Sequence, residues 1–138
     1  MRYVLDTSFA IDFLRARPAA VERMERLVSA GDEPYINDVV LCELATGTRP
    51  NETAALDGFV NGIEFVQPGP EVARLAGVWR GAARARGETL SVPDALIAAT
   101  ADALGATVLT RNERDFALTP VAVEGYQARK DHCRTPAR

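Results

Sequence analysis

The alternation of apolar and polar stretches along the chain predicts short strands separated by helices. Apolar side chains at helical spacing, bounded by capping residues, glycine or proline, predict helices around residues 9–14, 18–30, 38–46, 56–60, 70–86 and 93–104. Short apolar or β-branched runs predict strands around residues 3–5, 34–36, 63–66, 107–110 and 121–123. This order is typical of an α/β domain, with a mostly parallel, twisted sheet of four or five short strands flanked by helices.

The chain has the length of one domain. Its 138 residues, 47% of them apolar, can bury a core without disulfide bonds. No internal repeat or linker interrupts residues 1–126, for which we predict a single domain. Residues 127–138 are polar and charged, and we expect them to form a frayed tail.

Apolar stretches and cysteines indicate a cytoplasmic protein. No apolar run is long enough to span a bilayer, and Asp6 interrupts the first one too early for a signal peptide. Cys42 lies in an apolar run and is predicted to be a buried thiol, whereas Cys133 lies in the polar tail. We therefore expect no disulfide and no association with membranes.

The charge of the chain does not by itself indicate a nucleic-acid partner. The net charge is −3, which argues against binding nucleic acid through charge alone. Basic residues do cluster, as in Arg15 with Arg17 and Arg111 with Arg114. We interpret each such cluster as a solvated face of a helix.

Acidic and amide side chains follow the predicted strands, at the carboxyl edge where parallel sheets commonly bind ligands. Asp6 directly follows the first predicted strand, and Asn112 follows the strand at 107–110 by two residues, with Asp115 three residues further on. Because the carboxyl ends of parallel strands meet at one edge, we expect these residues there. Asp94 lies in the first turn of a helix, and Glu43 interrupts an apolar helix.

Each of these residues also has a purely structural interpretation. Asp6 could cap the following helix, and Asp94 could interact with a helix dipole. Glu43 could point into solvent from the polar face of its helix. Asn112 and Asp115 could be turn formers. No single position decides; their conjunction, with no lysine among them, favours a functional site.

Carboxylates gathered in this way favour a bound metal ion. Neighbouring carboxylates repel one another, and Mg²⁺ or Mn²⁺, which prefers oxygen ligands, relieves the repulsion. His132 is the only histidine and lies in the tail, which excludes a ribonuclease with two catalytic histidines. A phosphatase with an aspartate nucleophile would need an acid where Ser8 stands. A receiver domain would need a lysine after a late strand, whereas the only lysine is Lys130.

Four segments of the chain resemble the PIN-domain nucleases, and most of all the VapC toxins of type II toxin–antitoxin pairs. They are Val4-Leu5-Asp6-Thr7-Ser8, Val39-Val40-Leu41-Cys42-Glu43-Leu44, Val92-Pro93-Asp94-Ala95-Leu96-Ile97-Ala98-Ala99 and Leu109-Thr110-Arg111-Asn112-Glu113-Arg114-Asp115-Phe116. The resemblance extends over about residues 1–126 and keeps the order and spacing of the motifs.

The resemblance implies a Mg²⁺- or Mn²⁺-dependent endoribonuclease that cuts structured RNA such as tRNA or rRNA. It also implies a homodimer, and an antitoxin partner whose carboxy-terminal segment fills the site. Asp6, Glu43 and Asp94 correspond to the metal-site acids. Asn112 stands where many members have a fourth acid, with Asp115 as a possible substitute, and a neutral amide favours one metal over two. The alternative is a catalytically weak PIN fold that binds RNA or protein.

Overall fold

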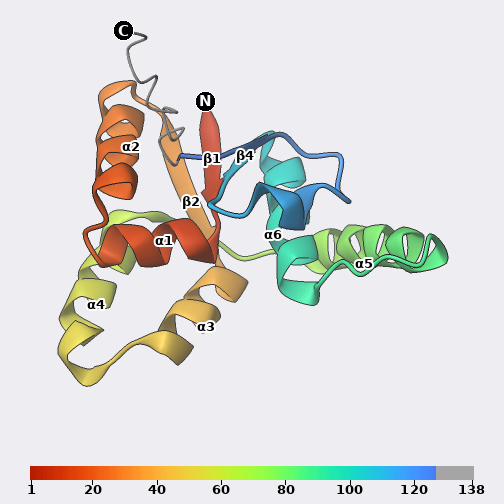
Figure 1. Cartoon of the computed structure of the whole chain (residues 1–138), viewed down its shortest axis with the longest axis horizontal. Coiled ribbons are helices and arrows are strands. Elements are labelled where there is room, and N and C mark those ends of the chain that lie inside the picture. Colours follow the sequence, from red (N-terminus) through yellow and green to blue (C-terminus); the bar gives the residue numbers. More distant parts are fainter. Residues whose placement is uncertain (127–138) are drawn as a thin grey trace, which may run out of the picture.

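The computed structural model describes residues 1–126, and the predicted tail at 127–138 lies outside the described residues. Residues 1–126 form one five-stranded sheet in the order β3-β2-β1-β4-β5 (Figure 1). The strands are β1 (Arg2–Leu5), β2 (Glu33–Asn37), β3 (Glu64–Val66), β4 (Thr107–Leu109) and β5 (Val123–Glu124). Every neighbouring pair is parallel, which confirms the predicted α/β class with a mostly parallel sheet of short strands.

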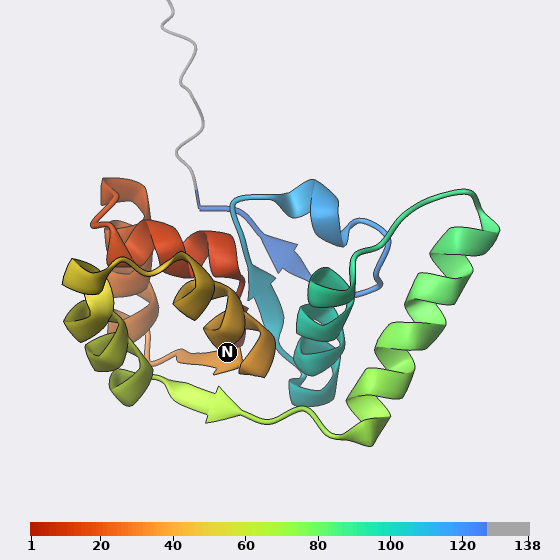
Figure 2. The same cartoon turned by 90° about the horizontal axis from the view of Figure 1, so that it is seen from below.

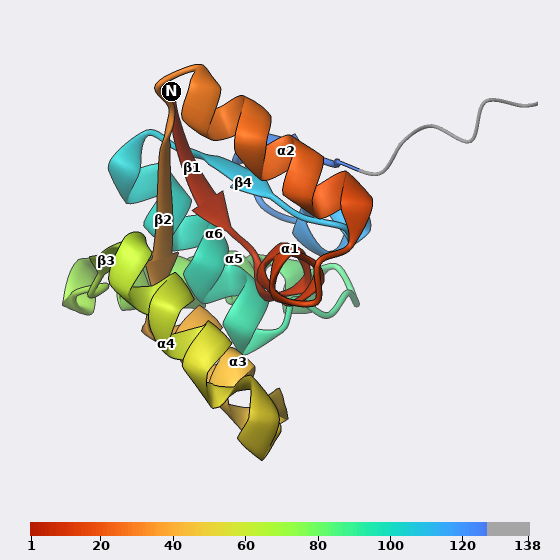
Figure 3. The same ribbon diagram turned by 90° about the vertical axis from the view of Figure 1, so that its left-hand side faces the viewer.

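Helices cover both faces of this sheet. They are α1 (Thr7–Leu14), α2 (Pro18–Ser29), α3 (Asp38–Gly47), α4 (Thr53–Gly62), α5 (Pro70–Ala85) and α6 (Val92–Leu104), with 3₁₀ turns η1 (Pro50–Glu52) and η2 (Glu113–Phe116). Helix α2 lies on one face of the central strands and α6 on the other (Figure 3). Helix α5 packs against the outer side of α6 (Figure 2). None of the helices in residues 1–126 combines the length and the apolar character that crossing a membrane requires.

The central strands are apolar because helices shield them on both sides. Val4 and Leu5 of β1, Ile36 of β2, and Val108 and Leu109 of β4 have no exposed surface. A strand in the middle of a parallel sheet is buried on both faces, and it therefore appears as a continuous apolar run instead of an alternating one. These strands form the core on which the loops at the carboxyl edge rest.

Three segments begin at the same edge of the sheet because β1, β2 and β4 run in one direction. Helix α1 follows β1, α3 follows β2, and the loop leading to η2 follows β4. Helix α6 joins them there, because it contacts both α3 and η2. The carboxyl edge is therefore surrounded by residues from four separate parts of the chain.

Most predicted boundaries differ from the observed ones by one or two residues, and the helix predicted at 56–60 spans Thr53–Gly62. Two of these differences have a clear cause. Helix α6 begins at Val92 instead of Pro93, because Ser91 caps it by accepting a hydrogen bond from the Asp94 N–H (3.2 Å). The last strand spans Val123–Glu124, whereas the apolar pattern placed it at 121–123. Both errors arise where a polar residue belongs to the element through backbone or capping bonds that an apolar pattern does not detect.

The prediction that Cys42 is a buried thiol was also wrong. Cys42 is a free cysteine on the exposed side of α3. Val40 and Leu44, four residues apart, form the buried stripe of this helix, so Cys42 points the other way. The continuous apolar run at 39–45 concealed a helix with one buried side.

Candidate active site

Asp6 stands directly after β1 and is held through one of its carboxylate oxygens. Its Oδ2 accepts hydrogen bonds from the hydroxyls of Ser8 (2.8 Å) and Thr110 (2.7 Å). Asp6 occupies the N-cap position of α1, but its side chain makes no capping bond, so the capping interpretation was wrong. Oδ1 accepts no hydrogen bond from any residue in 1–126. The carboxylate is therefore fixed in place and keeps one oxygen available for a ligand.

The two hydroxyls that hold Asp6 also fix the loop after β4. Ser8 Oγ accepts from the Arg111 N–H (3.1 Å), and Thr110 Oγ1 accepts from the Asn112 N–H (2.9 Å). The sequence analysis did not identify Thr110 as a site residue. No local pattern in the sequence marks it: Leu5 pairs with Leu109 across the folded sheet, and this register places the next residues along the chain, Asp6 and Thr110, side by side.

Asp94 lies half-buried in the first turn of α6. Burial raises the pKa of its carboxyl to about 6, a hydrogen bond with Ser91 opposes the shift, and the negative charges of Asp6, Asp115 and Glu43 add to it. The ionised form of Asp94 is therefore disfavoured where it stands. A first-turn acid that served only the helix dipole would have its pKa lowered instead.

Glu43 lies exposed on α3, and its side chain is hydrogen-bonded to a residue of α1. Its Oε1 accepts a hydrogen bond from the Thr7 hydroxyl (2.8 Å). Glu43 is therefore exposed to solvent, as the structural interpretation expected. Its side chain is nevertheless held by Thr7, and its negative charge contributes to the raised pKa of Asp94. Three acids far apart in sequence are therefore within electrostatic reach of one another.

Asn112 and Asp115 lie on the exposed loop that leads through η2. The Asp115 N–H donates to the Asn112 carbonyl (3.0 Å), so the pair does form the predicted turn. The charge of Asp115 nevertheless contributes to the raised pKa of Asp94. The turn thus brings Asp115 towards the acids, whereas the Asn112 side chain makes no hydrogen bond within the described residues.

The chemistry of this group fits a divalent cation held by few protein ligands. Within residues 1–126, no three side chains of the acidic, histidine or cysteine type are gathered closely enough to ligate one ion as they stand. Mg²⁺, however, keeps several waters and is commonly held by one or two carboxylates. Asp6, whose Oδ1 is available, and Asp94, whose negative charge a cation would stabilise, can supply these two carboxylates.

No side-chain cation neutralises the acids in the described part of the chain. The ion pairs formed there include none with Asp6, Glu43, Asp94 or Asp115. The loop after β4 carries two guanidinium groups: that of Arg111 pairs with Asp12 of α1 (2.7 Å), and that of Arg114 forms no ion pair within residues 1–126. An ion from solution is therefore the group that can balance these charges.

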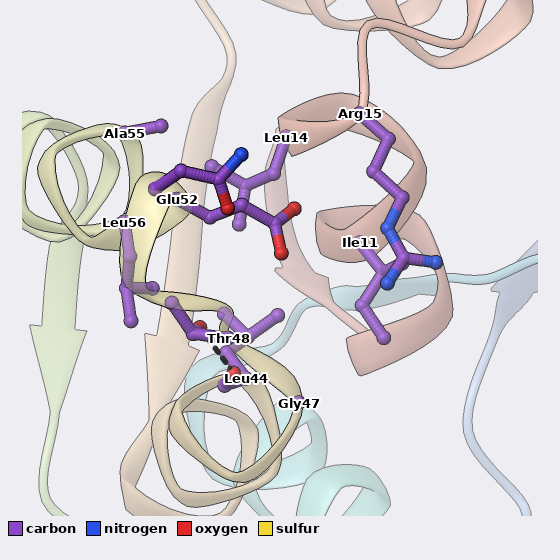
Figure 4. A pocket seen from close by; sticks show the side chains of 10 residues that line it. Ile11, Leu14, Arg15, Leu44, Gly47, Thr48, Glu52, Ala55 and Leu56 are labelled. Carbon is purple, nitrogen blue, oxygen red and sulfur yellow. Dashed lines mark hydrogen bonds between the residues drawn. The ribbon is translucent and has the colours of Figure 1, made fainter.

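A groove of about 270 Å³ opens between α1 and the segment from α3 to α4 (Figure 4). Its walls carry apolar side chains, among them Ile11, Leu14 and Leu56, with Arg15 and Glu52 on opposite sides. Helices α1 and α3, which form two of its walls, also carry Thr7 and Glu43. An apolar segment lying in this groove would approach the acids.

Comparison with known proteins agrees with this arrangement. A model of the PIN domain family matches residues 3–121. The chain belongs to the PIN-domain family. Ribonuclease VapC19 of Mycobacterium tuberculosis is 34% identical over 117 residues, covering 85% of this chain and 94% of that protein. The tRNA(fMet)-specific endonuclease VapC of Shigella flexneri is 27% identical over 121 residues, covering 84% and 90%.

The PIN fold is also found in solved VapBC structures. VapBC2 from Rickettsia felis, bound to a DNA fragment from its promoter, matches with a TM-score of 0.82 and 24% identity. The match covers 92% of this PIN-domain chain and all of the other. It supports the fold and says nothing of individual side chains at this level of identity.

Proposed function

We propose that this PIN-domain protein is the toxin of a type II toxin–antitoxin pair and acts as a divalent-metal-dependent endoribonuclease. The observation that supports the proposal most is the set of acids at the carboxyl edge: burial, with the charges of Asp6, Asp115 and Glu43 added to it, raises the pKa of Asp94, and none of these acids forms an ion pair within residues 1–126. The similarity to proteins named ribonuclease VapC19 and tRNA(fMet)-specific endonuclease VapC points to RNA as the polymer that is cut.

Asp6 and Asp94 would hold the ion, with Glu43 completing the acidic set. A bound Mg²⁺ or Mn²⁺ lowers the pKa of a water and neutralises the charge that develops on a phosphate. The protein's part is to hold the carboxylates still. Ser8 and Thr110 fix Asp6, and Thr7 fixes Glu43. Asn112 and Asp115 would lie at the rim of the pocket and orient the substrate or a water.

We propose structured RNA, tRNA or rRNA, as the substrate. The test is incubation of the purified full chain with tRNA and rRNA, with Mg²⁺ or with EDTA, followed by analysis of the product ends. Attack by water predicts a 5′-phosphate on the downstream fragment and no cleavage in EDTA. A 2′,3′-cyclic phosphate would instead mean attack by the ribose hydroxyl. Binding of RNA without any cleavage would favour the alternative, a catalytically weak binding module.

An antitoxin is the second partner that we propose, with the groove between α1, α3 and α4 as its binding place. The apolar lining suits an amphipathic helix, and Arg15 with Glu52 offers charge recognition at the rim. Ala55→Glu would place a charge in the groove and should weaken binding of the antitoxin encoded beside this gene. Ala54→Glu, exposed on the same helix but outside the groove, is the matched control. Equal effects of both changes would exclude this groove.

A homodimer and a cytoplasmic location complete the proposal. The apolar hollow between α3 and α6, with Val39, Cys42, Val92 and Leu96 in its lining, is the face that we propose for the second copy. Val92 is 48% exposed. Light scattering of the wild type and of Val92→Asp tests this: a variant that stays dimeric would exclude the face.

A further inference from the structure

A second hollow lies beside the acids, across the loop that follows β4. It measures about 310 Å³ and is bounded by Asp12, Arg17, Pro18, Ala19, Arg111 and Tyr126. Arg111 also lines the shallow hollow formed by residues 111–115, which contains Asn112 and Asp115. Arg111 therefore stands between the proposed metal site and this second hollow.

The Arg111 side chain is held in place by a buried carboxylate. Its NH1 donates to Asp12 Oδ1 (2.7 Å), and 10% of the Asp12 side chain is exposed against 40% of the Arg111 side chain. The other oxygen of Asp12 accepts from the Tyr126 hydroxyl. Burial and this hydrogen bond raise the pKa of Tyr126 far above its usual range, so its phenol stays a donor. Asp12 thus balances the charge of Arg111 and orients its guanidinium group, part of which stays exposed.

Arg17 reaches the same hollow through an unusual turn. Ala16 has a φ of 54°, in the left-handed region where a residue with a Cβ is strained by about 1–2 kcal/mol. The turn is closed by the Arg17 N–H, which donates to the Asp12 carbonyl (2.9 Å). Asp12 therefore positions both arginines, one through its side chain and one through its backbone. Arg17 is exposed and forms no ion pair within residues 1–126.

The hollow carries a positive charge in an acidic protein. Two guanidinium groups face one carboxylate, which leaves one positive charge uncompensated, while the whole chain has a net charge of −3. The start of α2 at Pro18 adds the positive end of a helix dipole. Guanidinium groups match the oxygens of a phosphate in both charge and shape.

From this arrangement we infer that the hollow binds a phosphate of the RNA strand next to the phosphate being cut. The inference rests on the proposed ribonuclease function. The Arg111 N–H and Asp6 are joined through a single hydroxyl, that of Ser8, at 3.1 and 2.8 Å. A strand with one phosphate at Asp6 that continues past Ser8 towards Arg111 meets the two guanidinium groups, which supply an attraction that the acids do not. Arg17 and Arg111 are substrate-binding residues in this account, and Asp12 is a positioning residue.

The test measures binding of a short, labelled single-stranded RNA to the full chain carrying Asp94→Asn, over a range of salt concentrations. Adding Arg17→Ala should weaken binding and lower the slope of log K against log salt by about 0.7, the share of one phosphate contact. Arg17→Lys should keep most of the slope. Arg26→Ala, exposed on the same helix α2 but outside the hollow, is the matched control and should leave the slope unchanged. In the cleaving protein, Arg17→Ala should raise KM and leave kcat nearly constant.

The outcomes separate this inference from the proposed function. RNA binding that depends on Arg17, in a protein that cleaves no RNA, would overturn the proposed function and keep the phosphate site. Equal slopes for Arg17→Ala and Arg26→Ala, or no measurable RNA binding, would overturn the phosphate site. Loss of antitoxin binding in Arg17→Ala with RNA binding unchanged would mean that the hollow receives an acidic protein segment, and the inference would be wrong.

Discussion

Replacing Asp94 by Asn should stabilise the metal-free protein at high pH and abolish cleavage. The pKa of Asp94 is raised from 3.8 to about 6, mainly by burial, so ionising it costs the folded state free energy that the unfolded chain does not lose. Without solvent screening, this pKa difference would lower the free energy of unfolding by about 3 kcal/mol at pH 8. The group is partly exposed to solvent, and screening reduces the cost to about 1 kcal/mol. For a domain of this size, that is a rise in Tm of about 4 °C.

The pH dependence follows from the direction of the shift. Well below pH 3.8, Asp94 is protonated in both the folded and the unfolded states, so wild type and variant should melt alike. As the pH rises from about 4 to about 6, the unfolded chain ionises before the folded one and the wild type loses stability relative to Asp94→Asn, and above about pH 6 the difference is complete. Saturating Mg²⁺ should make the wild type melt above Asp94→Asn, because the ion stabilises the ionised carboxylate of the wild type and not the amide.

Thermal melts at pH 3 and pH 8, with Mg²⁺ and with EDTA, measure these differences. Asp57→Asn, exposed on α4 far from the acids, is the matched control and should show no change of this kind. If Asp94→Asn melted below the wild type at pH 8 in EDTA, Asp94 would be a structural acid. The assignment of Asp94 to the metal site would then be refuted, whatever happened to activity.

Substitutions at three further positions test the metal site and the turn before α2. Asp6→Asn should lose most of the affinity for Mn²⁺ in calorimetric titration, and equal binding by both proteins would exclude Asp6 as a ligand. Asn112→Ala should lower turnover moderately and keep the first metal, whereas Asn112→Asp should strengthen a second one; an alanine variant that lost all metal binding would place Asn112 among the direct ligands. Ala16→Gly should raise the free energy of unfolding by about 1 kcal/mol in chemical denaturation, because glycine adopts the φ of 54° without strain; a lower stability would mean that the turn is not strained.

The sheet and its carboxyl edge could be predicted because they depend on local patterns. The apolar runs at β1 and β4 marked the central strands, and parallel geometry then placed Asp6 and the loop carrying Asn112 at one edge. The membership of Asp94 followed from its position at a helix start. These residues carry their signal within a few neighbours along the chain.

The contacts that hold the site could not be predicted in the same way. Thr110 and Asp6 are 104 residues apart, and Arg111 and Asp12 are 99 residues apart. Bonds over such separations depend on the final packing of strands, which no local pattern records. Asp12 did carry a hint, because it follows Ser8 by one helical turn and shares the buried side of α1. The prediction that Cys42 is buried was wrong for a related reason, since an apolar run does not reveal which side of a helix is buried.

We propose that Asp6 and Asp94, with Glu43 completing the acidic set, hold the divalent ion with which this PIN-domain protein cuts RNA. The most direct test is the rate of tRNA and rRNA cleavage across a Mn²⁺ titration, for the wild type and for Asp6→Asn, Glu43→Gln and Asp94→Asn, each shown to be folded by circular dichroism. The account predicts that wild-type cleavage rises with metal saturation and is abolished in EDTA, and that each variant loses cleavage while keeping its fold. Cleavage by the wild type in EDTA, or an undiminished rate in any of the three variants at saturating Mn²⁺, would contradict it.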